Sequence, residues 1–77
     1  MNYAVAIYDT SKGENYLYIV DGSTSSEAIK EAIIQNCDEE FRNEEFLAWV
    51  KSLGNNDTQV IANASESDLI VSNIEEL

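Results

Sequence analysis

Carboxylates are the most concentrated chemical groups in this sequence, and their densest run lies near its middle. Five fall within eight positions, around Phe41: Asp38, Glu39, Glu40, Glu44 and Glu45. Paired carboxylates perform acid–base catalysis when a cleft holds their pKa values apart. On an exposed surface they instead resemble the phosphates of duplex DNA, which carries one charge per roughly 1.7 Å of axis. Acidic surface runs rarely sit in clefts, so the sequence favours the second use.

Other chemistries lack the residues that they need. The chain contains no histidine, which excludes a histidine general base, triad or metal ligand. Gly13, Gly22 and Gly54 are the only glycines and lie too far apart for a phosphate-binding loop. Residues 9–14 are oxygen-rich but too short for a calcium loop and include Lys12, so they are interpreted as a hairpin turn. We therefore predict no enzyme, no cofactor and no metal.

The single cysteine, Cys37, gives a limited indication of the cellular compartment. It has no second cysteine for an intramolecular disulfide, and a redox role would need a partner thiol or basic neighbours. A packing residue in a reducing cytoplasm is the simplest interpretation. Residues 1–9 have neither the basic region of an export signal nor an apolar run that could span a bilayer. We expect a cytoplasmic protein without membrane contact.

The chain as a whole is strongly acidic. Its 15 Asp and Glu against 4 Lys and Arg give a formal net charge of −11 over 77 residues. Self-repulsion of this size opposes folding, so it suggests selection for solubility or for a cationic partner. An apolar fraction of 44% is ordinary for a globular protein, and we expect one domain, residues 1–77. The four cations are scattered, which disfavours direct nucleic-acid binding.

A β-hairpin is predicted at the start of the chain. Residues 3–8 and 15–20 are rich in Tyr, Val and Ile and flank a polar loop that contains a glycine. Pairing Tyr8 with Asn15 divides the side chains between two faces. One face holds Tyr3, Val5, Ile7, Tyr16, Tyr18 and Val20, and the other holds Ala4, Ala6, Leu17 and Ile19. The small alanines would let a helix approach their face closely. On the other face, the tyrosine rings could cover the core while their hydroxyls remain in contact with solvent.

Two helices are predicted to follow the hairpin. Thr24 and Glu27 have the spacing of a capping box, so the first helix should begin there and end near Asn36. Asn43 is a good N-cap for the second helix, which Gly54 should stop. The inward stripe of the second helix is expected to contain Phe46, Leu47, Val50 and Leu53, with Trp49 at least half buried.

The C-terminal part is predicted to return to strands. Residues 58–62 alternate in polarity and are interpreted as a third strand, and residues 68–72 as a fourth. The spacing of Ser65 and Asp68 also fits a capping box, which would make the tail a short helix instead. The predicted order is β-β-α-α-β-β. This order indicates an α+β fold, an antiparallel sheet of three to four strands with two helices on one face.

In size, acidity and lack of catalytic residues, the chain resembles the small acidic α+β inhibitors of phages and mobile elements. This class includes anti-CRISPR proteins and other DNA-mimic proteins, and the clusters at 38–40 and 44–45 carry the resemblance. The resemblance implies binding to a nuclease or CRISPR effector complex, where the inhibitor occupies a Lys- and Arg-lined groove and blocks nucleic-acid access. We therefore expect a stoichiometric inhibitor whose partner is a basic nucleic-acid-binding protein or a CRISPR effector complex.

The predicted partner-binding surface centres on the acidic run. Its primary members are Asp38, Glu39, Glu40, Glu44 and Glu45. Secondary contacts are expected at Glu27 and Glu31, one turn apart on the first helix, and at the C-terminal Glu75 and Glu76. Aromatic anchors usually dominate interface energy. Any exposed member of the set Tyr3, Tyr16, Tyr18 and Phe41 would supply the apolar part of the contact.

Two alternatives without nucleic-acid mimicry account for the same charges. A solvated loop followed by a helix N-terminus that favours acids would show the same acidic run. The runner-up function is a small structural or regulatory interaction module without mimicry, for instance a homodimer that uses the second apolar face of the hairpin. In either case an edge strand could recruit a partner by strand addition.

Overall fold

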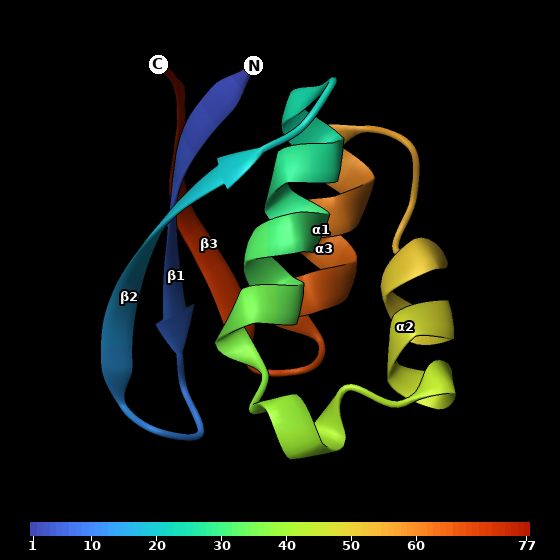
Figure 1. Cartoon of the computed structure of the whole chain (residues 1–77). Coiled ribbons are helices and arrows are strands. Elements are labelled where there is room, and N and C mark those ends of the chain that lie inside the picture. Colours follow the sequence, from blue (N-terminus) through green and yellow to red (C-terminus); the bar gives the residue numbers. More distant parts are fainter.

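One antiparallel sheet and three α-helices make up the computed structural model, which describes residues 1–77 (Figure 1). The elements are, in chain order, β1 (Asn2–Asp9), β2 (Glu14–Asp21), α1 (Ser25–Asn36), the 3₁₀ helix η1 (Glu39–Phe41), α2 (Glu44–Lys51), α3 (Asp57–Ser65) and β3 (Leu69–Glu76). The strands lie in the order β2-β1-β3. The predicted α+β class is confirmed, but the order of elements is β-β-α-α-α-β.

The hairpin has the predicted register, with Tyr8 opposite Asn15. Its loop turns at Gly13, whose φ of 68° lies in the left-handed region that glycine tolerates. The N–H of Gly13 donates to the carbonyl of Asp9 at 2.8 Å. The polar residues between the strands therefore form a hairpin turn, as their composition predicted.

The helices pack on the opposite face of the hairpin from the alanine face. The helix-covered face buries Tyr3, Val5, Ile7 and Val20. On the other face, Leu17 and Ile19 remain 66% and 58% exposed. Burial of apolar area stabilises the fold by roughly 25 cal/mol per Å², and the covered face of β1 carries Tyr3, Val5 and Ile7 where the other face carries Ala4 and Ala6. The expected close approach of a helix to the alanines is therefore wrong.

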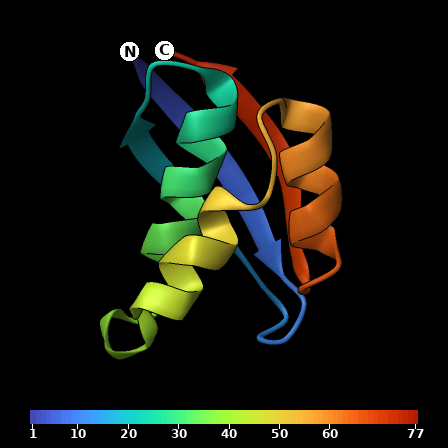
Figure 2. The ribbon, with the colours of Figure 1, turned by 90° about the vertical axis from the view of Figure 1, so that its right-hand side faces the viewer.

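The helices form two layers on one side of the sheet (Figures 1 and 2). α1 contacts all three strands and α3 contacts β3, so these two helices cover the sheet. α2 packs against α1 on the side away from the sheet. The core between the layers consists of Tyr3, Val5, Ile7, Val20, Ala28, Ile29, Ala32, Ile33, Val50, Leu53, Val60 and Ala64. None of the helices combines the length and the hydrophobicity that a membrane-spanning segment needs.

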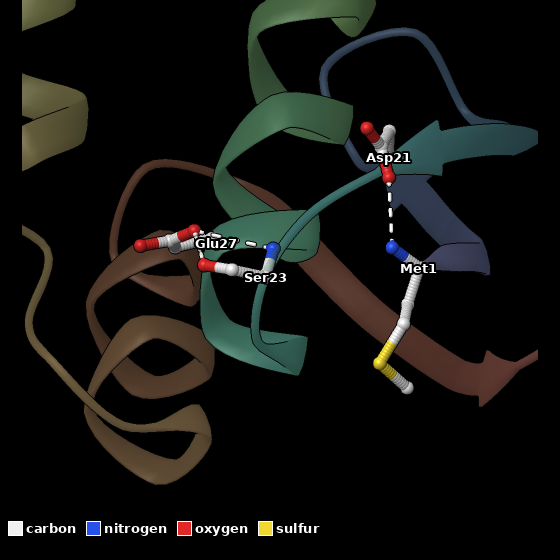
Figure 3. A network of polar contacts seen from close by, with 4 residues as sticks. All are labelled: Met1, Asp21, Ser23 and Glu27. Atoms are coloured by element: carbon white, nitrogen blue, oxygen red, sulfur yellow. Dashed lines mark hydrogen bonds and ion pairs between the residues drawn. The ribbon is translucent and has the colours of Figure 1, made fainter.

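α1 begins and ends where its sequence predicts. The hydroxyl oxygen of Thr24 accepts from the N–H of Glu27 at 3.3 Å. The Glu27 carboxylate turns back one residue further than in a standard capping box, and it accepts from the N–H and hydroxyl of Ser23 (Figure 3). Nearby, the N-terminal ammonium of Met1 donates to Asp21 at 3.0 Å. These contacts fix the entry of the chain into α1.

α2 begins at the predicted cap, since the Asn43 side chain accepts from the N–H of Phe46 at 2.9 Å. Val50 is buried and Trp49 is half buried, as expected, and the Phe46 and Trp49 rings pack with centroids 5.8 Å apart. Leu47 is 38% exposed, so its predicted place in the inward stripe is wrong. Because α2 packs mainly against α1, its buried stripe is narrow, and Leu47, about 100° around the helix from Phe46, falls outside it.

Residues 58–62, predicted as a strand, lie within α3. The Asn56 side chain accepts from the N–H of Gln59 at 3.0 Å and caps this helix. Val60 and Ala64, four residues apart on the helix, are buried. Five alternating residues also fit a helical pattern. The cap and the core contacts decide in favour of the helix.

The last element is a strand, which confirms the prediction for residues 68–72 and overturns the alternative of a C-terminal helix. β3 is longer than predicted and pairs with β1 over most of its length, with a register shift between Ala6 and Ile7. The Ser65–Asp68 segment forms a turn, in which the N–H of Asp68 donates to the carbonyl of Ser65 at 3.2 Å. Asp68 has a φ of 67°, which breaks the helical path.

Candidate functional site

The acidic segment, residues 38–45, lies beyond the C-terminal end of α1 and includes η1 and the first residues of α2 (Figure 1). Its five carboxylates are exposed: Asp38, Glu39, Glu40, Glu44 and Glu45. Phe41 is 59% exposed among them. The structure thus presents the primary predicted contacts and one aromatic side chain on a single exposed connection.

Backbone and side-chain hydrogen bonds hold the shape of the acidic segment. The N–H of Phe41 donates to the carbonyl of Asp38 at 2.9 Å, and the N–H of Arg42 donates to the carbonyl of Glu39 at 3.2 Å. The Asn43 cap then starts α2 directly. Both acidic clusters therefore belong to hydrogen-bonded turns.

Arg42 is the only cation in the acidic segment, and it does not neutralise its neighbours. Its Nε donates to the carbonyl of Cys37 at 2.9 Å, and its Nη2 donates to the carbonyl of Gln35 at 3.3 Å. Carbonyls at a helix C-terminus have no partner inside the helix. The one ion pair of the whole structure joins the N-terminal ammonium to Asp21. None of the five carboxylates therefore forms an ion pair within the chain.

Replacing Arg42 with alanine should loosen the acidic segment. We expect a loss of about 1–2 kcal/mol in unfolding free energy, because two charge-assisted hydrogen bonds to backbone carbonyls disappear. Hydrogen exchange of the backbone amides of residues 41 and 42 should become faster in this variant. Lys51→Ala is the matched control, since it removes the same charge from an exposed side chain without such bonds. Equal exchange rates in the two variants would contradict the capping role.

Tyr16 and Tyr18, two of the predicted aromatic anchors, lie near the same end of the molecule as the acidic segment. Both are half buried on the helix side of β2. The Tyr18 hydroxyl donates to Asn36 Oδ1 at 2.7 Å, at the end of α1. The Tyr16 hydroxyl donates to Glu14 at 2.9 Å, and this bond raises the pKa of the Tyr16 phenol. Tyr3 is buried in the core. Phe41 is therefore the most exposed of the four predicted aromatic anchors.

The secondary predicted contacts lie apart from the acidic segment. Glu27 is in the first turn of α1, and a helix of this length spans about 18 Å. Glu31 lies between Glu27 and the acidic segment along α1 and is half buried. Glu75 and Glu76 pair with the beginning of β1, close to the chain termini. The negative charge is thus divided between two ends of the molecule and does not form one continuous face.

One carboxylate at the second end was not predicted as part of a site. Asp57, in the first turn of α3, accepts from the Ser25 hydroxyl at 2.7 Å and so joins the starts of α1 and α3. Burial raises the pKa of the Tyr3 phenol, and the negative charges of Glu76 and Asp57 raise it further. The sequence signal for Asp57 is its place directly after a good N-cap, Asn56.

A buried polar network ties the end of α1 to the sheet beside the acidic segment. Asn36 Nδ2 donates to Asp9 Oδ2 at 3.2 Å, and the N–H and hydroxyl of Ser11 donate to Asp9 Oδ1 at 3.1 and 2.6 Å. Burial alone would raise the pKa of the Asp9 carboxyl, but the donors from Ser11, Asn36 and the backbone outweigh it and lower the pKa. The charged carboxylate is therefore the stable form in the fold.

No pocket indents the surface, and no three acidic or cysteine side chains converge as a group that could hold a metal ion. The molecule is a small acidic α+β protein whose candidate site is an exposed, hydrogen-bonded acidic turn. Comparisons with protein-family models, curated proteins and solved structures find no match to this chain.

Proposed function

We propose that this protein is a stoichiometric inhibitor of a nucleic-acid-processing complex, such as a CRISPR effector or a nuclease. The acidic segment occupies a Lys- and Arg-lined groove on that complex and blocks the access of nucleic acid. One observation carries the proposal. Five exposed carboxylates lie on a turn whose only cation, Arg42, is bound to backbone carbonyls and leaves their charge for an external partner.

The geometry of the segment suits a phosphate-binding groove. Carboxylates form charge-assisted hydrogen bonds with guanidinium and ammonium groups, the same donors that hold phosphates. The hydrogen bonds of η1 and of the Asn43 cap reduce the conformational freedom that binding would have to remove. Phe41 provides an apolar side chain within the charged surface, where aromatic residues commonly act as anchors.

The remaining negative charge contributes at longer range. A net charge of −11 attracts a basic partner before contact and raises the association rate. Exposed charges are screened beyond about 10 Å at 0.1 M salt. Carboxylates in the acidic segment therefore set the contact, while the others act mainly on the encounter.

The proposal is tested with a panel of purified guide-RNA-loaded CRISPR effector complexes and nucleases. We expect inhibition of target cleavage to reach completion at about one inhibitor per complex, target DNA to compete with the inhibitor, and affinity to fall at least tenfold between about 0.1 and 1 M salt. Absence of inhibition across the panel would contradict the proposal. Inhibition that neither salt nor target DNA affects would contradict nucleic-acid mimicry.

A further inference from the structure

β2 is an edge strand with free backbone groups along one side. It pairs with β1 only. The N–H of Gly22 donates to the carbonyl of Met1 at 3.0 Å. Because an antiparallel ladder alternates, the even-numbered residues of β2 direct their backbone groups toward β1, and the odd-numbered residues from Asn15 to Asp21 direct theirs outward.

The uncharged middle of this edge, residues 15–20, lacks the usual protection against strand pairing. Proteins shield edges with Lys, Pro, bulges or covering elements. The pairing of β2 with β1 is continuous, the chain has no proline, and residues 15–20 are uncharged. The other edge differs, because β3 has a register shift opposite Ala6 and Ile7.

Exposed apolar side chains accompany the free backbone groups. Leu17 and Ile19 are 66% and 58% exposed on the outer face of the sheet, which no helix covers. On the helix side of the same strand, Tyr16 and Tyr18 are half buried. A strand added at this edge would therefore gain backbone hydrogen bonds and also cover apolar area on both faces.

We propose that β2 pairs antiparallel with β2 of a second copy of this chain, about a two-fold axis at Tyr18, to form a six-stranded sheet. In this register, Leu17 of one copy faces Ile19 of the other, and each of these residues directs its backbone groups across the new interface. Asn15 faces Asp21 and Glu14 faces Gly22, so no like charges are directly opposite. A parallel arrangement would place identical carboxylates side by side, which is destabilising.

The net charge of −11 opposes this contact, but part of that charge lies away from β2. α2, which carries Glu44 and Glu45, is separated from the sheet by α1 and lies away from β2, whereas Asp38 and η1 follow the end of α1 that Tyr18 contacts (Figure 1). Exposed carboxylates separated by more than a Debye length, about 10 Å at 0.1 M salt, repel one another weakly. Added salt should strengthen the dimer, whereas it weakens an acidic contact with a basic partner.

The size of the interface places the dimer in the transient class. Eight residues of strand extend about 27 Å. Pairing along one strand edge buries less than the roughly 800 Å² per partner of a standard interface, so we expect a dissociation constant in the micromolar range or weaker. Association of this strength depends on protein concentration.

Sedimentation equilibrium of the full chain tests this proposal at concentrations up to about 1 mM, in about 0.1 and 1 M salt. We expect a monomer–dimer equilibrium that is stronger at high salt. Leu17→Lys should weaken dimerisation about tenfold or more by placing a solvated charge at the paired edge. Ile70→Lys makes the same charge change on β3 and should leave the dimer unchanged.

Circular dichroism verifies the fold of each variant, and Ile19→Lys replaces Leu17→Lys if the latter unfolds. A monomer at about 1 mM in both salts would overturn the proposal and leave the edge to a strand of another protein. A dimer that survives a folded edge variant would also overturn it. Equal weakening by Ile70→Lys would indicate face-to-face packing of the sheets instead.

Discussion

Reversing four charges of the acidic segment together should weaken binding to the nucleic-acid-processing partner about 100-fold or more. The changes are Glu39→Lys, Glu40→Lys, Glu44→Lys and Glu45→Lys. An exposed ion pair contributes roughly 0.2–1 kcal/mol, and each reversal also adds repulsion from the basic groove. Four reversals should therefore cost about 3 kcal/mol, which is roughly 100-fold in the dissociation constant. Titration calorimetry or inhibition curves at fixed salt measure the change.

A matched variant separates the contact from the total charge. Glu14→Lys, Glu66→Lys, Glu75→Lys and Glu76→Lys together change the net charge equally, at exposed positions outside the acidic segment. We expect this control to slow association and to leave most of the affinity intact. Equal loss in both variants would show that binding follows net charge alone. Reversal at the α2 N-terminus costs roughly 0.3–1 kcal/mol per residue in stability, so circular dichroism must verify folding.

Replacing Asn36 with alanine should lower the unfolding free energy by about 2–4 kcal/mol. The substitution removes the amide that donates to Asp9 and the oxygen that accepts from Tyr18, and it leaves a buried carboxylate short of a donor. A domain of this size has a total stability of the order of 5–10 kcal/mol, so the loss is a large fraction of it. Urea denaturation measures the difference. Gln35→Ala, at the exposed neighbouring position, should change stability by less than about 0.5 kcal/mol.

The effect of Asn36→Ala should depend on pH with a defined sign. The folded-state pKa of Asp9 lies below its ordinary value of 3.8, so its stabilising contribution is present above that value and is lost as pH falls through the lowered folded-state pKa. Without Asn36, the folded-state pKa of Asp9 rises. The two proteins should therefore converge in stability in acid. A difference that stays constant down to about pH 2 would show that the Asp9 hydrogen bond is not its cause.

Local patterns predicted much of this fold because the residues that decide them are close in sequence. Asn43 caps α2 through a contact three residues away, and Thr24 does the same for α1. The hairpin register follows from side-chain alternation around a short loop. The acidic segment was predicted to lie between two helices, and the structure places it there. Phe41 was expected to contribute to the contact only if it was exposed, and in the structure it is exposed.

Elements that depend on distant contacts were predicted less well. The local pattern of residues 58–62 fits either a strand or a helix. In the structure these residues are helical, and α3 packs against α1 and β3. Which face of the hairpin is covered depends on the packing of whole helices against β1. The pairing of Asp9 with Asn36, 27 residues apart, has no local signature.

The sequence by itself determined the net charge, the position of the densest carboxylate run and the caps that begin α1 and α2. These properties reside in composition or in contacts within one helical turn. Only the tertiary structure decided that Arg42 binds backbone carbonyls, that Glu27 and the C-terminal glutamates lie apart from the acidic segment, and that β2 is an open edge. The physical reason is that charge neutralisation and edge exposure depend on which groups the folded chain brings together, and sequence distance does not specify that.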